Sequence, residues 1–153
     1  MKRIVCILTS IIISVSVFCS CSHRIHSPEI LARTISESLD FGGVLYSSTA
    51  SLGEERYLPR DLISQMFFSP IPEDTELALV ILPSVKMTHE VGVFYSRDTK
   101  HRLCILELVA GRLSLLESYG GECGSVLVAR GGYIIYAFLP TADRLYSIVD
   151  DIF

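Results

Sequence analysis

Ser125–Asp143, with the sequence SVLVARGGYIIYAFLPTAD, carries the clearest fold signal in the chain. Ser125–Ala129 and Tyr133–Leu139 are apolar runs of strand length, and Arg130-Gly131-Gly132 between them supplies the glycines that a tight turn requires. Pro140-Thr141 then begins a short helix whose apolar residues share one face. The stretch therefore predicts an antiparallel hairpin followed by a helix.

The preceding region predicts a second strand pair and a long helix. Glu76–Leu82 is a nearly continuous apolar run, and EVGVFYS, starting at Glu90, alternates apolar residues. The two runs can pair across Ser84–His89. Asp98 can cap a helix from about residue 99 to Glu117. The order ββαββα favours an α+β fold with an antiparallel four-stranded sheet and helices packed on it.

One or two helices are expected before this core. Ser27-Pro28-Glu29 is a typical helix start, and an apolar stripe follows it at Ile30, Leu31, Ile35 and Leu39. Val44–Leu58 shows no clear period and is interpreted as a loop. A short second helix is expected over Pro59–Phe67. Residues 28–153 are thus predicted to form a single α+β domain.

The N-terminus has the pattern of an export signal. Lys2 and Arg3 precede Ile4–Phe18, which contains no charge. An apolar run of about 15 residues is short for a permanent membrane span, which needs about 20. The leading positive charges would hold the N-terminus in the cytoplasm and send the body of the chain across the membrane.

Phe18-Cys19-Ser20-Cys21 resembles the lipobox of bacterial lipoproteins, in which an apolar residue and two small residues precede a cysteine that becomes lipidated. That resemblance implies that 1–20 is a lipoprotein signal peptide, that Cys21 is the lipid attachment site, and that 21–27 is a tether. The alternatives are an uncleaved N-terminal anchor and an ordinary secreted protein. The resemblance places the protein at the cell membrane, lipid-anchored and facing outside.

Charge and ligand chemistry exclude several classes of function. The chain has 13 Lys and Arg against 17 Asp and Glu, and loss of residues 1–20 would leave 11 against 17. A charge of −6 without a basic cluster does not favour nucleic-acid binding. His23 and His26 are more typical of a solvated tether than of a metal site, because a third ligand is not nearby. No metal or cofactor is predicted.

The long helix carries apolar residues on two sides. Leu106, Val109, Leu113 and Leu116 predict its buried face. A second seam is formed by Cys104, Leu108, Gly111 and Leu115. Either the first helix covers this seam within one molecule, or the seam is a surface for a protein partner or for a homodimer.

No catalytic constellation emerges from the sequence. Cys104 and Cys123 are predicted to be separate thiols, because the helix carries the first about 20 Å away from the helix end, beyond the reach of a disulfide. Glu122 beside Cys123 would raise the pKa of the thiol instead of activating it. Phosphate-loop, serine-hydrolase, dinucleotide and calcium-loop motifs are all missing from the sequence.

The body of the chain resembles a family of small lipoproteins from Gram-positive Firmicutes that share a domain of unknown function. EVGVFYSRDTKH and SVLVARGGYIIYAFLPTAD carry most of the likeness, which covers roughly residues 60–150. The resemblance implies no catalytic residues. We expect a non-enzymatic, membrane-tethered interaction module. A receptor for a small ligand, with an apolar pocket between sheet and loops, is the second reading, and a hydrolase is the third.

Overall fold

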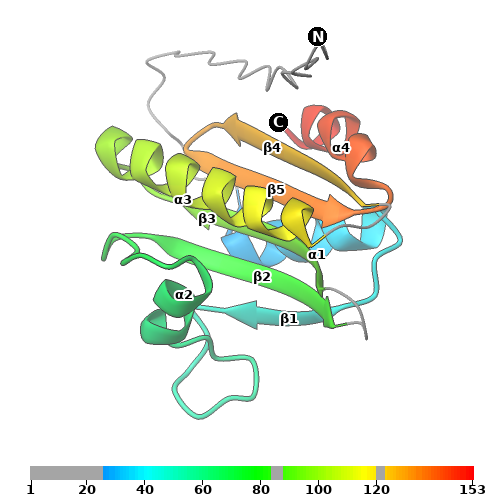
Figure 1. Cartoon of the computed structure of the whole chain (residues 1–153). Helices are drawn as coiled ribbons and strands as arrows, with labels where there is room; N and C mark the ends of the chain where they lie inside the picture. Colours follow the sequence, from blue (N-terminus) through cyan, green and yellow to red (C-terminus); the bar gives the residue numbers. More distant parts are fainter. Residues whose placement is uncertain (1–25, 84–87, 120–122) are drawn as a thin grey trace, which may run out of the picture.

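The computed structural model describes residues 26–83, 88–119 and 123–153. The predicted signal peptide (1–20), Cys21, most of the predicted tether (21–27) and residues 84–87 and 120–122 therefore lie outside the described residues. Figure 1 shows the order of the elements, which are α1 (Pro28–Ser38), β1 (Val44–Ser47), α2 (Arg60–Met66), β2 (Glu76–Pro83), β3 (Thr88–Tyr95), α3 (Thr99–Ser118), β4 (Gly124–Arg130), β5 (Tyr133–Leu139), the 3-10 turn Ala142–Arg144 and α4 (Leu145–Ile152).

The fold is α+β, as the sequence predicts, and its sheet is antiparallel throughout, with the strand order β1-β2-β3-β5-β4. The predicted number of four strands is wrong, because β1 adds a fifth within the region interpreted as a loop. β1 has four residues, and its pairing of Val44 with Ile81 joins segments far apart in the chain. So short a strand forms because β2 is available to pair with it, and not because its own residues show a strand pattern.

The hairpin of β4 and β5 has the predicted turn. Gly131 and Gly132 both have positive φ angles, of 58° and 90°, which are strained for residues with a side chain. Arg130 pairs with Tyr133 across the turn, and the ladder continues without interruption to the pairing of Gly124 with Leu139. The turn therefore sets the register of the whole hairpin.

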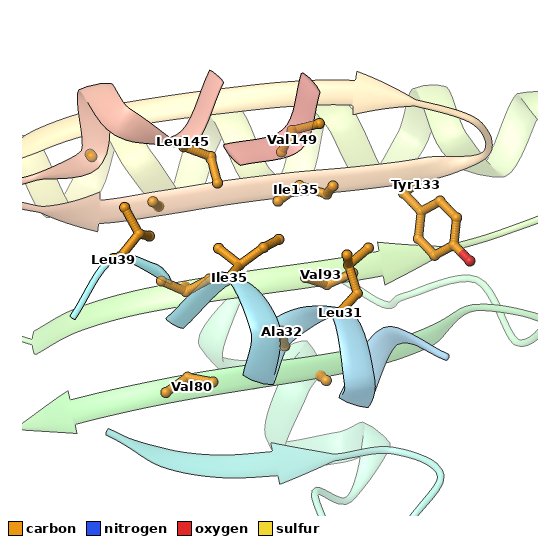
Figure 2. Packing of buried hydrophobic residues seen from close by; sticks show 14 of the residues in the cluster. Leu31, Ala32, Ile35, Leu39, Val80, Val93, Tyr133, Ile135, Leu145 and Val149 are labelled. Atoms are coloured by element: carbon orange, nitrogen blue, oxygen red, sulfur yellow. The ribbon is translucent and has the colours of Figure 1, made fainter. Parts of the chain in front are cut away.

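Both faces of the sheet are covered. α1 and α4 lie on one face, and Figure 2 shows residues such as Leu31, Ile35 and Val149 packed against Val93 and Ile135 of the sheet. α2 and α3 lie on the other face, over a second apolar cluster. β5 is buried along its whole length because its side chains point alternately into the two clusters, one on each face of the sheet.

The first helix begins as predicted, with the Ser27 hydroxyl accepting the N–H of Ile30 and Pro28 in the first turn. Its predicted apolar stripe is correct except at Ile30, which is 56% exposed. The buried face is instead completed by Ala32 and Ser36. The small side chains at these positions let the helix approach the sheet closely.

The predicted cap and length of the long helix are confirmed. The Asp98 carboxylate accepts the backbone N–H groups of Lys100 and His101. The predicted buried face is nearly right, but Ile105 is fully buried and Leu106 only partly so.

The expectation that the first helix covers the second seam of α3 is wrong, because α1 and α3 pack on opposite faces of the sheet. The first helix was one of the two covers that the spacing of the seam allowed. Spacing identifies apolar faces of a helix but does not tell which element lies over them.

Candidate functional site

The residues singled out from the sequence do not converge on one site. Cys104, Leu108 and Leu115 are half-buried, whereas Gly111 is exposed, and a Cβ atom added to it would meet no described atom within 4 Å. The glycine therefore serves no close approach of a described backbone. The seam is the flank of α3, and Leu108 packs against the edge of the apolar cluster beneath the helix.

The cysteines and the possible metal ligands of the described residues lie apart from one another. No disulfide joins Cys104 to Cys123, as the sequence predicts, and both side chains are half-buried. The residues that the structure describes contain no group of three or more side chains able to hold a metal ion. Within the same residues, no helix combines the length and apolar character needed to cross a bilayer.

Asp74, Ser96 and His101 form a cluster that the sequence did not predict. The Ser96 hydroxyl donates to Asp74 Oδ2 at 2.8 Å, and His101 Nδ1 lies 2.5 Å from Asp74 Oδ1. The carboxylate thus sits between the hydroxyl and the imidazole, whereas a nucleophilic triad needs the imidazole in the middle. Ser96 is also only 1% exposed. The cluster joins the start of β2 to the first turn of α3 and is structural.

Hydrogen bonding controls the charge of Asp74. Burial by itself would raise the pKa of this carboxyl, but the hydrogen bonds from Ser96 and His101 outweigh burial and hold the pKa below its usual range. The pKa of Asp98 is likewise lowered, chiefly by the backbone N–H groups of His101 and Lys100 that it caps. The lowered pKa values favour the ionised form of both carboxylates, which accept hydrogen bonds at the start of α3.

The most buried polar cluster joins Glu90 of β3, Arg112 of α3 and Tyr136 of β5. Arg112 Nε and Nη2 donate to the two carboxylate oxygens of Glu90, each at 3.0 Å, and the Tyr136 hydroxyl donates to Oε1 at 3.1 Å. Glu90 is fully buried, and the Arg112 side chain is 14% exposed. A bidentate pair with a further donor is the arrangement that compensates a buried charge.

Gly92 makes room for this cluster. A Cβ atom at Gly92 would lie 2.0 Å from Cε1 of Tyr136, so the tyrosine ring occupies the space above the glycine. The pKa of Tyr136 is raised well above its usual value, first by burial and then by the charge of Glu90. The hydroxyl therefore stays protonated and donates to Glu90. Glu90 and Tyr136 are shielded from solvent, and the cluster fastens α3 to the sheet.

An open groove of about 420 Å³ lies between α1 and β1. Phe41, Leu45 and Val80 contribute apolar side chains to it, while Arg33 and Arg56 contribute guanidinium groups. Glu37 lines the same groove, and Arg33 is already paired with Glu29 at 3.2 Å. The mixed lining differs from the apolar pocket that a small-ligand receptor was expected to show.

Tyr133, the second fully buried tyrosine of β5, forms a clasp of two hydrogen bonds with the backbone of His26, at the start of the described chain. The Tyr133 hydroxyl donates to the carbonyl of His26 at 2.5 Å and accepts its N–H at 3.2 Å. Tyr133 is fully buried and packs against Tyr95 and Phe153. The backbone at His26 is consequently fixed to the sheet, five residues after Cys21.

Compared with protein-family models, with curated proteins and with solved structures, the chain gives no significant match.

Replacing Arg112 by Met should destabilise the protein strongly, by about 3–5 kcal/mol, because Glu90 would remain charged and buried without its partner. The double variant Glu90→Gln/Arg112→Met should lose less than Arg112→Met alone, since the glutamine is neutral and can still accept from Tyr136. Denaturant unfolding measures both. Arg144→Met, at an exposed position with a single hydrogen bond to a carbonyl, is the control and should change stability little. Equal losses of unfolding free energy in the single and double variants would contradict this account, because they would show that the unpaired charge of Glu90 is not what destabilises Arg112→Met.

Asp74→Asn should destabilise the protein in a pH-dependent way. Because the pKa of Asp74 is lower in the folded state, its contribution is present above the unfolded pKa of about 4 and is lost as pH falls through the folded value. The difference in free energy of unfolding between wild type and variant should therefore shrink from pH 5 to pH 3. Ser96→Ala, which removes one donor, should reduce the pH-dependent part without abolishing it. A difference that stays constant over this window would contradict the assignment.

Proposed function

We propose that the protein is a lipid-anchored, extracytoplasmic module of the cell surface that acts by binding and not by catalysis. Cys21 carries the lipid, and the α+β domain is held outside the membrane. The observation that carries this proposal is the clasp between Tyr133 and His26, because it makes the folded domain begin directly after the lipobox-like sequence.

The anchor is supported by the sequence and by the position of the clasp. Lys2 and Arg3 followed by Ile4–Phe18 form the export signal, and Cys21 stands where a lipidated cysteine is expected. The five residues from Cys21 to His26 can span at most about 17 Å. So short a connection suits a domain that stays close to the lipid surface.

A binding role is supported by the nature of the polar clusters. The Glu90 carboxylate is fully buried and fully paired, and the Asp74 cluster has its serine buried and its imidazole on the wrong side for activating a hydroxyl. The hydrogen bonds of both clusters hold α3 in place, and this structural role accounts for their residues. The resemblance to small Firmicutes lipoproteins with a domain of unknown function agrees with a surface module but adds no site.

Replacing Cys21 by Ser tests the proposal. The wild-type protein from the membrane fraction should have the mass of residues 21–153 plus acyl groups, and it should partition into detergent. The variant should lose both properties, because it has no thiol to acylate. Cys19→Ser is the matched control, since it keeps Cys21 and should leave acylation intact. Uncleaved chains without acyl groups in both wild type and Cys21→Ser would instead identify Ile4–Phe18 as a permanent anchor.

A further inference from the structure

The two edges of the sheet are finished in different ways. At β1, the N–H of Ser47 donates to the carbonyl of Arg56 at 2.8 Å, and the carbonyl of Ser47 accepts the N–H of Leu58 at 3.1 Å. Tyr57 forms a parallel bridge with the same residue. β1 is also only four residues long. This edge is thus short and partly covered by its own chain.

Among the described residues, nothing protects the edge at β4 in this way. It is seven residues long, and no described segment outside β5 forms a backbone hydrogen bond with it. The strand contains neither lysine nor proline, and its ladder with β5 runs without a bulge. Its only charged residue is the last one, Arg130. Proteins usually protect an edge of this length and apolarity, so an unprotected one indicates a pairing surface.

We propose that β4 pairs antiparallel with β4 of a second copy of the chain, so that the two five-stranded sheets become one continuous sheet. The pairing that overlaps all seven residues places Leu127 opposite Leu127 of the second copy. Strand addition to a free edge supplies main-chain hydrogen bonds to the outward N–H and C=O groups of β4.

The side chains of β4 are complementary to themselves in this register. Val126 lies opposite Val128, Ser125 opposite Ala129, and Arg130 opposite Gly124, so that no two like charges meet. Val126 and Val128 pack towards the α1 and α4 face, while Leu127 packs towards the α2 and α3 face. Because opposite residues have the same parity, each apolar side chain meets another on its own face of the sheet.

The symmetry of such a pair also suits a membrane-bound protein. An antiparallel pairing of two identical strands has its two-fold axis perpendicular to the sheet, so α1 of both copies lies on the same side. Tyr133, which clasps His26, belongs to the apolar cluster on that side. Both tethers therefore leave from one side of the pair. The pairing itself does not depend on the lipid anchor.

Disulfide trapping in the full-length protein tests the register. In a Cys104→Ser/Cys123→Ser background, Leu127→Cys should form a disulfide-linked dimer on mild oxidation, because the paired α-carbons lie within disulfide range. Ala129→Cys is the matched control. It is more exposed, but its counterpart in the second copy is offset by four residues, about 13 Å, so it should not cross-link. Ser125→Cys combined with Ala129→Cys should restore the disulfide-linked dimer, because position 125 lies opposite position 129 of the second copy.

Sedimentation in density-matched detergent provides a measurement that needs no new cysteine. Wild type should show concentration-dependent dimerisation, and Ala129→Lys should weaken it several-fold by placing a charge on the edge. Leu108→Glu on the seam of α3 should leave it unchanged. A wild-type monomer at all concentrations would overturn the proposal, and so would equal cross-linking at positions 127 and 129. Loss of dimerisation in Leu108→Glu would also overturn it, because the interface would then lie on α3. These results are independent of the mass at Cys21 and so separate this inference from the proposed anchor.

Discussion

Two buried hydroxyl groups on β5 constrain the structure on both sides of the sheet. Tyr133 and Tyr136 are fully buried in a strand without other polar side chains, so each hydroxyl must find a partner within the protein. They are three residues apart and therefore point to opposite faces. Tyr133 reaches the backbone of His26 on the α1 side, and Tyr136 reaches Glu90 on the α3 side. One strand thus fixes where the domain begins and where its longest helix lies.

The consequences on the α3 side extend through the Glu90 carboxylate. Because the tyrosine donates to a buried charge, Arg112 must be present to compensate it, and Arg112 brings α3 over β5 and β3. Gly92 completes the arrangement by leaving room for the ring. On the α1 side the same strand holds the N-terminal segment beside the hairpin turn. β5 is flanked by β3 and β4, which leaves β4 at the boundary of the sheet.

Local patterns in the sequence predicted most elements but not the contacts between them. Four strands, the caps at Ser27 and Asp98, and the glycine turn are encoded by neighbouring residues and were found. β1 was missed because its pairing partner lies more than thirty residues away. The Glu90 cluster was missed because its members are separated by 22 and 46 residues. Gly92, a glycine inside an apolar strand, was the available signal, since such glycines often mark a close approach. Of the two covers considered for the α3 seam, the first helix was wrong, because the spacing of apolar residues does not show which distant element packs on a helix.

Hydrogen exchange in wild type, Tyr133→Phe and Tyr136→Phe measures the separate roles of the two hydroxyls most directly. Each variant should lose about 1 kcal/mol of stability. Tyr133→Phe should lose protection at the His26 amide and the first turn of α1, with α3 unchanged. Tyr136→Phe should lose protection in α3 near Arg112, with the first turn of α1 unchanged. Equal loss on both faces in both variants, or an unprotected His26 amide in wild type, would contradict the account.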